Sequence, residues 1–286
     1  MPHPVLGVDH AYLLVDDLNA SSEVYRKLGF TLSPRGLHSP QKGTANHTII
    51  FADDYFELLG IVRETDQNLP QRQMLAQDGE GLKAIANRTE SADAAKQALA
   101  ELGLATGDVS AFSRPLPLPG GGEGLASFRT LSFEPDGVPL GHFFLCQHET
   151  PHLVWRKELQ QHDNGAISIA GIVGIHEDPQ ATAETYARFY ANGSVSAAEG
   201  GFSVKTGEKS APLLFVNADT ALALYPSVAP QENDTNRLLA LRISVSDIER
   251  VKNVLADNDV AYSVTEGGNI VVAPGDASGT IIEFVV

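Results

Sequence analysis

A pattern of apolar and polar positions recurs four times along the chain. In its first copy, an apolar run over residues 7–17 ends in two aspartates, and residues 19–30 carry apolar side chains at helical spacing. Gly29 stands where such a helix would end. Three further apolar stretches follow, at 30–38, 45–52 and 55–62. The pattern therefore predicts one strand, one helix and then three strands.

The second copy repeats this order further along the chain. It predicts a strand at 81–90 and a helix at 91–103, and two later strands at 126–137 and 140–148. Residues 114–124 are rich in proline and glycine, so we expect a loop there.

The third and fourth copies follow the same plan. Each predicts a first strand and a helix, at 167–178 and 179–193 and again at 238–247 and 248–260. The strands expected to complete these two copies lie at 195–207, 211–218 and 220–225, and at 261–268, 269–276 and 280–286.

The copies also agree in detail. Asp17 and Tyr25 are eight residues apart, and so are Asp178 and Tyr186. A period of roughly 70 residues is too long for a solenoid repeat and indicates duplicated supersecondary units. We therefore expect an α+β fold of four tandem βαβββ modules that form two domains, 1–150 and 166–286, joined by a linker at 151–165.

Composition narrows the partners of this fold. The chain has 286 residues and a formal net charge of −16, so its surface should repel nucleic acids and anionic membranes. Its single cysteine, Cys146, allows no intrachain disulfide, and the first residues lack the pattern of a signal peptide. The longest apolar stretch, near 166–175, is too short to span a bilayer. We expect a cytoplasmic protein that acts on a small molecule, and the open sheet edges would allow a homodimer.

Two segments of the first module resemble a known family. GVDHAYLLVDDL (7–18) and GTANHTIIFADDYFELLGI (43–61) are similar to the glyoxalase-like group of the vicinal-oxygen-chelate superfamily, and FFLCQHETPHLVWR (143–156) is similar to members of the same group. The superfamily includes glyoxalases, extradiol dioxygenases, bleomycin-resistance proteins and epimerases. The resemblance implies paired modules around a cleft, in which the first and last strands of each module supply ligands to one divalent metal.

On this resemblance, His10 and Glu57 are the candidate ligands of the first module. Imidazole and carboxylate suit Fe, Mn, Zn, Ni or Co, but a site needs about three protein ligands. The other three modules place Ala84, Gly171 and Ala240 where the first has His10. The third ligand must then come from the last strand of the second module.

That strand offers two histidines. Strand alternation gives one set of side chains the same parity as Glu57: His142, Phe144, Cys146 and His148. We predict the metal ligands to be His10, Glu57 and His148, with Glu57 also acting as the catalytic base.

The remaining site residues are expected to contact the substrate. They are Arg35, His38, Asn46 and His142. Because an unpaired buried carboxylate is costly, Glu57 needs a partner, which could be the metal or a base such as Arg35. Cys146 is expected to serve packing.

These residues support two functions. The first is a divalent-metal-dependent enzyme, of the lyase, isomerase or ring-cleaving dioxygenase type, acting on a small molecule with vicinal oxygens. The alternative is a metal-free small-molecule-binding protein of the bleomycin-resistance type. The third and fourth modules have no histidine on their first strands at the position of His10, so they are expected to be a scaffold, an oligomerisation surface or a metal-free pocket.

Overall fold

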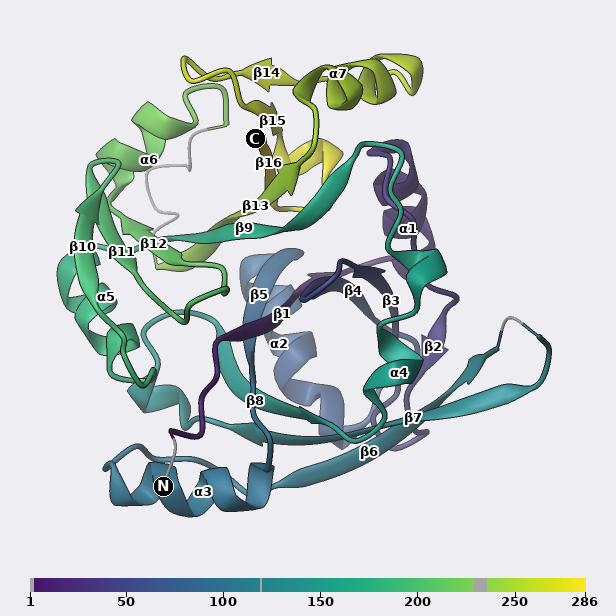
Figure 1. The fold of residues 1–286 in the computed structure, drawn as a ribbon, viewed down its shortest axis with the longest axis vertical. Helices are drawn as coiled ribbons and strands as arrows, with labels where there is room; N and C mark the ends of the chain where they lie inside the picture. The colour runs from purple at the N-terminus through teal and green to yellow at the C-terminus, as the bar shows by residue number, and fades with distance from the viewer. Residues whose placement is uncertain (1–2, 119, 229–235) are drawn as a thin grey trace.

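The computed structural model describes residues 3–118, 120–228 and 236–286. Within them the chain forms two sheets of eight strands that lie one above the other in Figure 1. The first sheet contains β1 (Val8–Val15), β2 (Gly36–Leu37), β3 (Thr44–Ile50), β4 (Tyr55–Ile61), β5 (Gly81–Arg88), β6 (Ser110–Pro117), β7 (Glu123–Ser132) and β8 (His142–His148). The second contains β9 (Ala166–Ile175), β10 (Val195–Ala198), β11 (Gly201–Val204), β12 (Leu213–Val216), β13 (Arg237–Val245), β14 (Ser263–Val264), β15 (Ile270–Val272) and β16 (Ile281–Val285).

The two sheets share one topology. The first runs β2-β3-β4-β1-β5-β8-β7-β6, and the second runs β10-β11-β12-β9-β13-β16-β15-β14. In each, the first strands of two modules pair antiparallel at the centre, and each of these strands pairs in parallel with the last strand of its own module. This arrangement confirms the α+β fold of four βαβββ modules in two pairs.

Each module contributes one helix between its first and second strands. These helices are α1 (Leu18–Lys27), α3 (Ala92–Glu101), α5 (Pro179–Ala187) and α7 (Ile248–Asp257). A side chain that accepts hydrogen bonds from first-turn amides caps each one, and the four caps are Asp17, Ser91, Asp178 and Asp247. Among the described residues, no helix is both long enough and apolar enough to cross a membrane.

The repeated Asp–Tyr spacing has a structural reason. Asp17 and Asp178 start α1 and α5, and the tyrosines eight residues later, Tyr25 and Tyr186, are fully buried. The Tyr25 hydroxyl donates to the carbonyl of Ala277 at 3.1 Å, and the Tyr186 hydroxyl donates to the carbonyl of Leu140. Each tyrosine therefore ties its own sheet to the opposite one.

Three predicted elements were wrong. The single strand expected at 195–207 is the antiparallel pair of β10 and β11. The loop expected at 114–124 is strand at both ends, since its residues up to Pro117 belong to β6 and those from Glu123 belong to β7, which pairs with β6. Prolines are tolerated there because β6 is the edge of its sheet. The strand expected at 220–225 lies in helix α6 (Ala218–Leu224), which Asn217 caps by accepting from the amide of Thr220.

Two more helices lie outside the modules. They are α2 (Leu69–Asp78), between the first and second modules, and α4 (Pro151–Val154), after the second. The limits of the two predicted domains stay a prediction, although the strands of the two sheets fall within 8–148 and 166–285.

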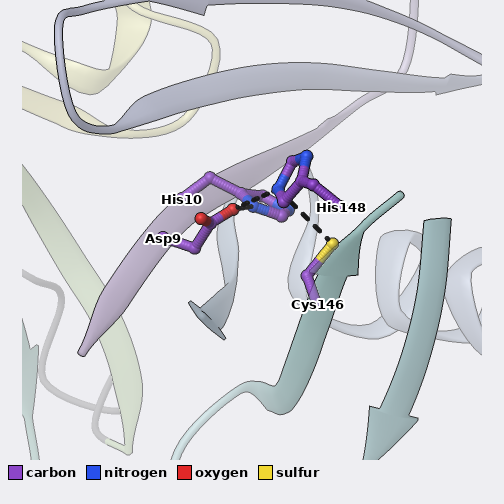
Figure 2. Close-up of side chains that lie close together, drawn as sticks. All are labelled: Asp9, His10, Cys146 and His148. Carbon is purple, nitrogen blue, oxygen red and sulfur yellow. Dashed lines mark hydrogen bonds and ion pairs between the residues drawn. The ribbon is translucent and has the colours of Figure 1, made fainter. Parts of the chain in front are cut away.

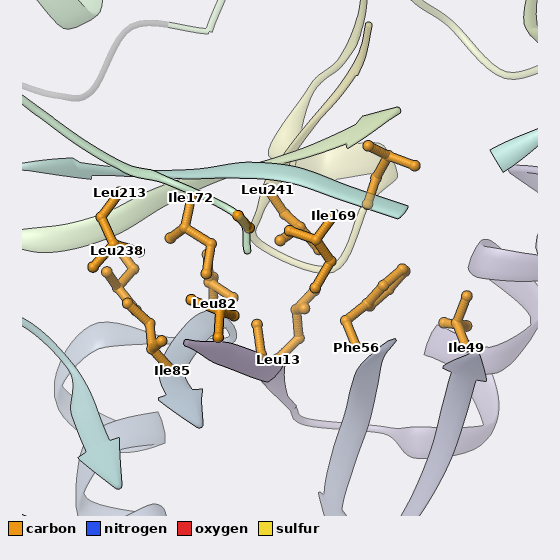
Figure 3. Close-up of a cluster of buried hydrophobic side chains, with 14 of the residues drawn as sticks. Leu13, Ile49, Phe56, Leu82, Ile85, Ile169, Ile172, Leu213, Leu238 and Leu241 are labelled. Atoms are coloured by element: carbon orange, nitrogen blue, oxygen red, sulfur yellow. The ribbon is translucent and has the colours of Figure 1, made fainter. Parts of the chain in front are cut away.

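The two sheets share a single apolar core. Alternate residues of the central strands point into it, so that Leu13 and Phe56 of the first sheet meet Ile169 and Leu241 of the second (Figure 3). The same core takes in the buried faces of the four module helices. Because one face of each sheet is used in this way, polar side chains of the central strands can gather only on the other face.

In the second sheet that other face is filled. The α6 helix places Ala221 against it, and Tyr225 follows directly after the helix in the same apolar cluster. Glu283 on β16 is 3% exposed and accepts hydrogen bonds at 2.7 Å from Arg242, Tyr225 and Asn269. Arg242 also donates two hydrogen bonds to Glu199. A closed network thus takes the space where a ligand would have to sit.

From this network we expect the loss of stability on removing Glu283 to be much larger than that on removing Glu199. Replacing Glu283 by alanine leaves the Arg242 guanidinium partly unpaired in a buried position, and should lower the free energy of unfolding by about 3–5 kcal/mol. The Glu199 side chain is 46% exposed, so Glu199→Ala should cost at most about 1 kcal/mol. Urea unfolding of both variants measures the difference, and equal losses would contradict the account.

The contact between the sheets also contains a buried acid. Asp54, just before β4, is 8% exposed and accepts a hydrogen bond at 3.0 Å from the amide of Ile169 on β9. Burial raises the pKa of Asp54 to about 7, with a smaller opposing effect from that hydrogen bond. The folded state therefore holds a proton on Asp54 that the unfolded chain releases at lower pH.

Stability should fall as the pH rises through this range. The contribution of the protonated Asp54 to the free energy of unfolding is fully present below the ordinary pKa of 3.8, and it is lost as the pH rises past about 7. Asp54→Asn keeps an oxygen that accepts from Ile169 but has no proton to lose. We expect this variant to be more stable than the wild type at pH 8 or so and to differ less at about pH 5, by urea unfolding. Asp136→Asn, at an exposed acid that is not among the groups that shift the pKa of Asp54, is the control, and a pH-independent effect of Asp54→Asn would refute the assignment.

Candidate functional site

The open face of the first sheet forms a cavity. The sheet curves until its two edge strands meet, and at this contact Gly36 on β2 lies against the guanidinium of Arg114 on β6. Any side chain at position 36 would collide with Arg114 and Asn46. The enclosed space is about 350 Å³, and strands β1, β3, β4, β6, β7 and β8 all contribute to its wall.

Strand alternation decides which side chains reach this cavity. Tyr55, Glu57 and Leu59 of β4 line it, whereas Phe56 and Leu58 between them point into the shared core. On β8 the residues at the cavity are His142, Phe144 and Cys146, which have the same parity as Glu57, as the alternation argument predicts. Phe144 pairs with Ala86 on β5 as Glu57 pairs with Tyr12 on β1. The second module thus has a phenyl ring at the position of Glu57.

At one end of the cavity four potential metal ligands come together (Figure 2). Asp9, His10, Cys146 and His148 each offer an atom, and all four atoms lie within 4.8 Å of one another. Asp9 is at the centre, because its Oδ2 lies 2.8 Å from His10 Nδ1 and 2.8 Å from His148 Nε2. His10 and Cys146 belong both to this cluster and to the cavity wall.

Asp9 was missed by the sequence analysis. Simple alternation would send it to the face opposite His10, but the pairing of β1 with β5 shifts register between Val8 and His10. The bulge brings the carboxylate of Asp9 and the ring of His10 to the same side of the strand. Such a bulge has no residue signature in this strand, so only the three-dimensional pairing reveals it.

The Asp9 carboxylate is fully buried and fully paired. Its Oδ1 accepts from Arg88 Nε at 2.9 Å. Burial alone would raise the pKa of Asp9, but the hydrogen bonds and charges of His10 and His148 outweigh it and hold that pKa well below its usual range. Asp9 is therefore a carboxylate at neutral pH, and it orients both imidazole rings.

Glu57 lies in the cavity wall outside this cluster. Among the described residues, the group of close metal-type ligands does not include it, so the structure groups His10 and His148 around Asp9 and not around Glu57. Asn46 on β3 donates a hydrogen bond from Nδ2 to Glu57 Oε2 at 2.5 Å. The partner expected for this acid is thus an amide, and Arg35 does not supply it.

The other predicted substrate contacts fall into two groups. His38, Asn46 and His142 line the cavity, whereas Arg35 is exposed and donates to Asn19 on α1. Burial lowers the pKa of His38 to about 3 and that of His142 to about 4, helped by nearby cations. Both rings are therefore neutral at physiological pH. One nitrogen of His38 is bonded to the Thr44 hydroxyl, whereas both nitrogens of His142 are bonded to hydroxyls, those of Tyr12 and Ser132.

Sequence reasoning also missed two cations of the cavity. Lys42 comes directly before the Gly-Thr-x-Asn segment, with Nζ 3.5 Å from the centre of the Phe112 ring. Arg114 lies in the stretch that was predicted to be a loop, and it is 5% exposed. A correct assignment of β6 would have placed Arg114 and Phe112 on the same strand face.

The chain matches a family model over residues 8–190, and that model describes a glyoxalase-like domain. No curated protein sequence matches this chain significantly. Three solved structures have the same fold at low sequence identity, so they bear on the fold alone.

The first is a hypothetical protein from Staphylococcus aureus, with a TM-score of 0.66 and 13% identity over 97% of this chain and 98% of that one. The second is a variant of 4-hydroxymandelate synthase from Streptomyces coelicolor, with a TM-score of 0.61 and 14% identity over 98% and 92%. The third is a variant of homoprotocatechuate 2,3-dioxygenase from B. fuscum, with a TM-score of 0.57 and 14% identity over 99% and 72%. The family match covers more than half of the chain, and the motifs around His10 and Glu57 lie inside it. This chain belongs to the glyoxalase-like domain family.

Proposed function

We propose that this chain is an enzyme that acts on a small molecule with vicinal oxygen atoms in the cavity of the first sheet, with the help of a divalent metal ion. The observation that carries the proposal is the position of the Asp9–His10–Cys146–His148 cluster. Two of its members also form the cavity wall, so an ion held there would face the bound molecule.

The chemistry of these side chains fits a transition metal. Two imidazoles and one carboxylate are the ligand set of many iron enzymes, and the addition of a thiol suits zinc. Asp9, His10 and His148 would hold the ion, with Cys146 beside them. Bound there, a divalent ion supplies a Lewis acid that polarises the substrate oxygens.

Glu57 would then act on the substrate and would not bind the metal. Its carboxylate lines the same cavity, and Asn46 fixes one of its oxygens by a hydrogen bond. A carboxylate in such a position can accept a proton from a carbon next to a carbonyl group. The neutral ring of His38 would orient the substrate by a hydrogen bond, and His142, whose two nitrogens already bind Tyr12 and Ser132, would contact it through its ring.

A metal-free binding protein is the second candidate. One observation favours it: Asp9 already accepts from His10, His148 and Arg88, so the cluster is satisfied by its own hydrogen bonds. In addition, Ala84 and Phe144 stand at the two positions of the second module that match His10 and Glu57.

Metal content separates the two candidates. We expect protein purified without chelator or nickel affinity resin to contain a stoichiometric divalent metal, measured by elemental analysis. His10→Ala and His148→Ala should lose the metal, because each removes a ligand of the cluster. His142→Gln, on the same strand but outside the cluster, should keep it.

Glu57→Gln tests the division of roles. It should retain the metal and lose turnover of an accepted substrate by about two orders of magnitude or more, as expected for a general base. Loss of the metal in Glu57→Gln would instead make Glu57 a ligand. Wild-type protein without any metal would sink the enzyme proposal in its metal-dependent form and leave the binding protein.

A further inference from the structure

The cavity wall also carries a buried cation, Arg114, outside the Asp9–His10–Cys146–His148 cluster. Arg114 is 5% exposed, and it makes no hydrogen bond or ion pair with any of the residues that the structure describes. Its guanidinium lies 6.0 Å from the centre of the Phe128 ring. Burying a guanidinium without a hydrogen-bonded partner costs free energy, and an anionic ligand in the cavity would offset that cost.

The second sheet of the same chain shows how a buried arginine is otherwise satisfied. Arg242 donates three hydrogen bonds, two to Glu199 and one to Glu283, at 2.7–2.8 Å. The acid near Arg114 is Glu57, whose charge raises the pKa of Arg114, but the hydrogen bond that Glu57 accepts comes from Asn46. Among the described residues, Arg114 therefore has no hydrogen-bonded counter-ion of the kind that Arg242 has.

Lys42 adds a second positive charge to the same part of the cavity. Its ammonium group lies over Phe112, and Phe112 stacks on Phe128 with ring centres 5.1 Å apart. The charges of Lys42 and Arg114 both lower the pKa of His38, so both lie near that ring. Burial lowers the pKa of each cation more than Glu57 raises it. The positive charge of this wall is therefore only partly compensated.

Two acceptor oxygens of the cavity are also without partners. Asn46 Oδ1 and Gln71 Oε1 are buried and accept no hydrogen bond. Asn46 Oδ1 cannot turn away, because its amide nitrogen is committed to Glu57. It lies next to the Arg114 guanidinium at Gly36. A ligand that suits this wall must bring negative oxygens for the cations and a hydroxyl or amine donor for the amide oxygens.

We propose that the cavity binds a small organic oxyanion, a carboxylate or a phosphate ester, whose oxygens pair with Arg114 and Lys42 and whose hydroxyl group donates to Asn46. The faces of Phe112 and Phe128 provide apolar surface for the body of the molecule. This assignment deepens the proposed function, on which it rests for the location of the site, and it names the class of substrate.

The test uses binding, so that it does not depend on turnover. The probes are phenyllactate, which has a carboxylate, a hydroxyl and a ring, its neutral methyl ester, and inorganic phosphate. Isothermal titration calorimetry is run on the full chain as purified and again in the presence of EDTA, because a bound metal could itself attract the acid. We expect phenyllactate to bind about tenfold more tightly than its ester in both conditions.

Variants assign that preference to Arg114. Arg114→Gln should remove the preference for the acid and leave binding of the ester unchanged. Arg129→Gln is the matched control, since Arg129 lies on the neighbouring strand β7 and pairs with Asp93 at the surface. Gly36→Ala should weaken binding of the acid without changing any charge, because the added methyl group displaces the guanidinium. Circular dichroism checks that each variant is folded, and Lys42→Gln provides a second charge removal outside the strands.

Each outcome decides the proposal. Equal binding of acid and ester, equal effects of Arg114→Gln and Arg129→Gln, or no binding of either oxyanion in the millimolar range would overturn it. Displacement of phenyllactate by phosphate would point to phosphate esters, and lack of displacement to carboxylates. Selective binding by protein that already lacks metal as purified, before any EDTA is added, would refute the metal-dependent enzyme and leave the anion site standing, whereas protein purified with its metal but without selectivity would do the reverse.

Discussion

The structure depends on the burial of one face of each sheet against the other. Strands with a period of two can satisfy a shared apolar core only by sending every second residue to the opposite face. Leu13 and Phe56 take the core side, so His10, Tyr12 and Glu57 must take the other. The position of the site thus follows from packing, and a shift of one residue in β1 or β4 would destroy the core and the site together.

The same regularity explains what could be predicted from the sequence. The order of strands and helix in each module, the repeated Asp–Tyr spacing and the alternation along β8 are local patterns, and each of them is found in the structure. The features that escaped are those that alternation or composition describes wrongly. Asp9 reaches the site through a bulge, and Arg114 lies in a proline-rich edge strand that has the composition of a loop.

The long-range contact between Asp9 and His148 was equally beyond the sequence. Nothing local indicates that Asp9 would lie between His10 and His148, which are 138 residues apart in the chain. The acid predicted to join these histidines, Glu57, has the right parity, but its nearest hydrogen-bonding group is Asn46. Parity gives the face of a strand and leaves open which neighbours on that face a side chain will contact.

The two sheets each carry a glutamate and an arginine on the face away from the shared core, but in different roles. Glu283 and Arg242 in the second sheet satisfy each other and close the space above it, whereas Glu57 and Arg114 in the first face an open cavity. The edge strands β2 and β6 touch at Gly36 and Arg114, but in the part of the chain that the structure describes they are not paired with each other. The first sheet is consequently a barrel with a slit along one side. An anion that bound both Arg114 on β6 and Asn46 on β3, next to β2, would link the two edges of this slit. Binding of a ligand in the cavity would therefore also make the barrel wall more rigid.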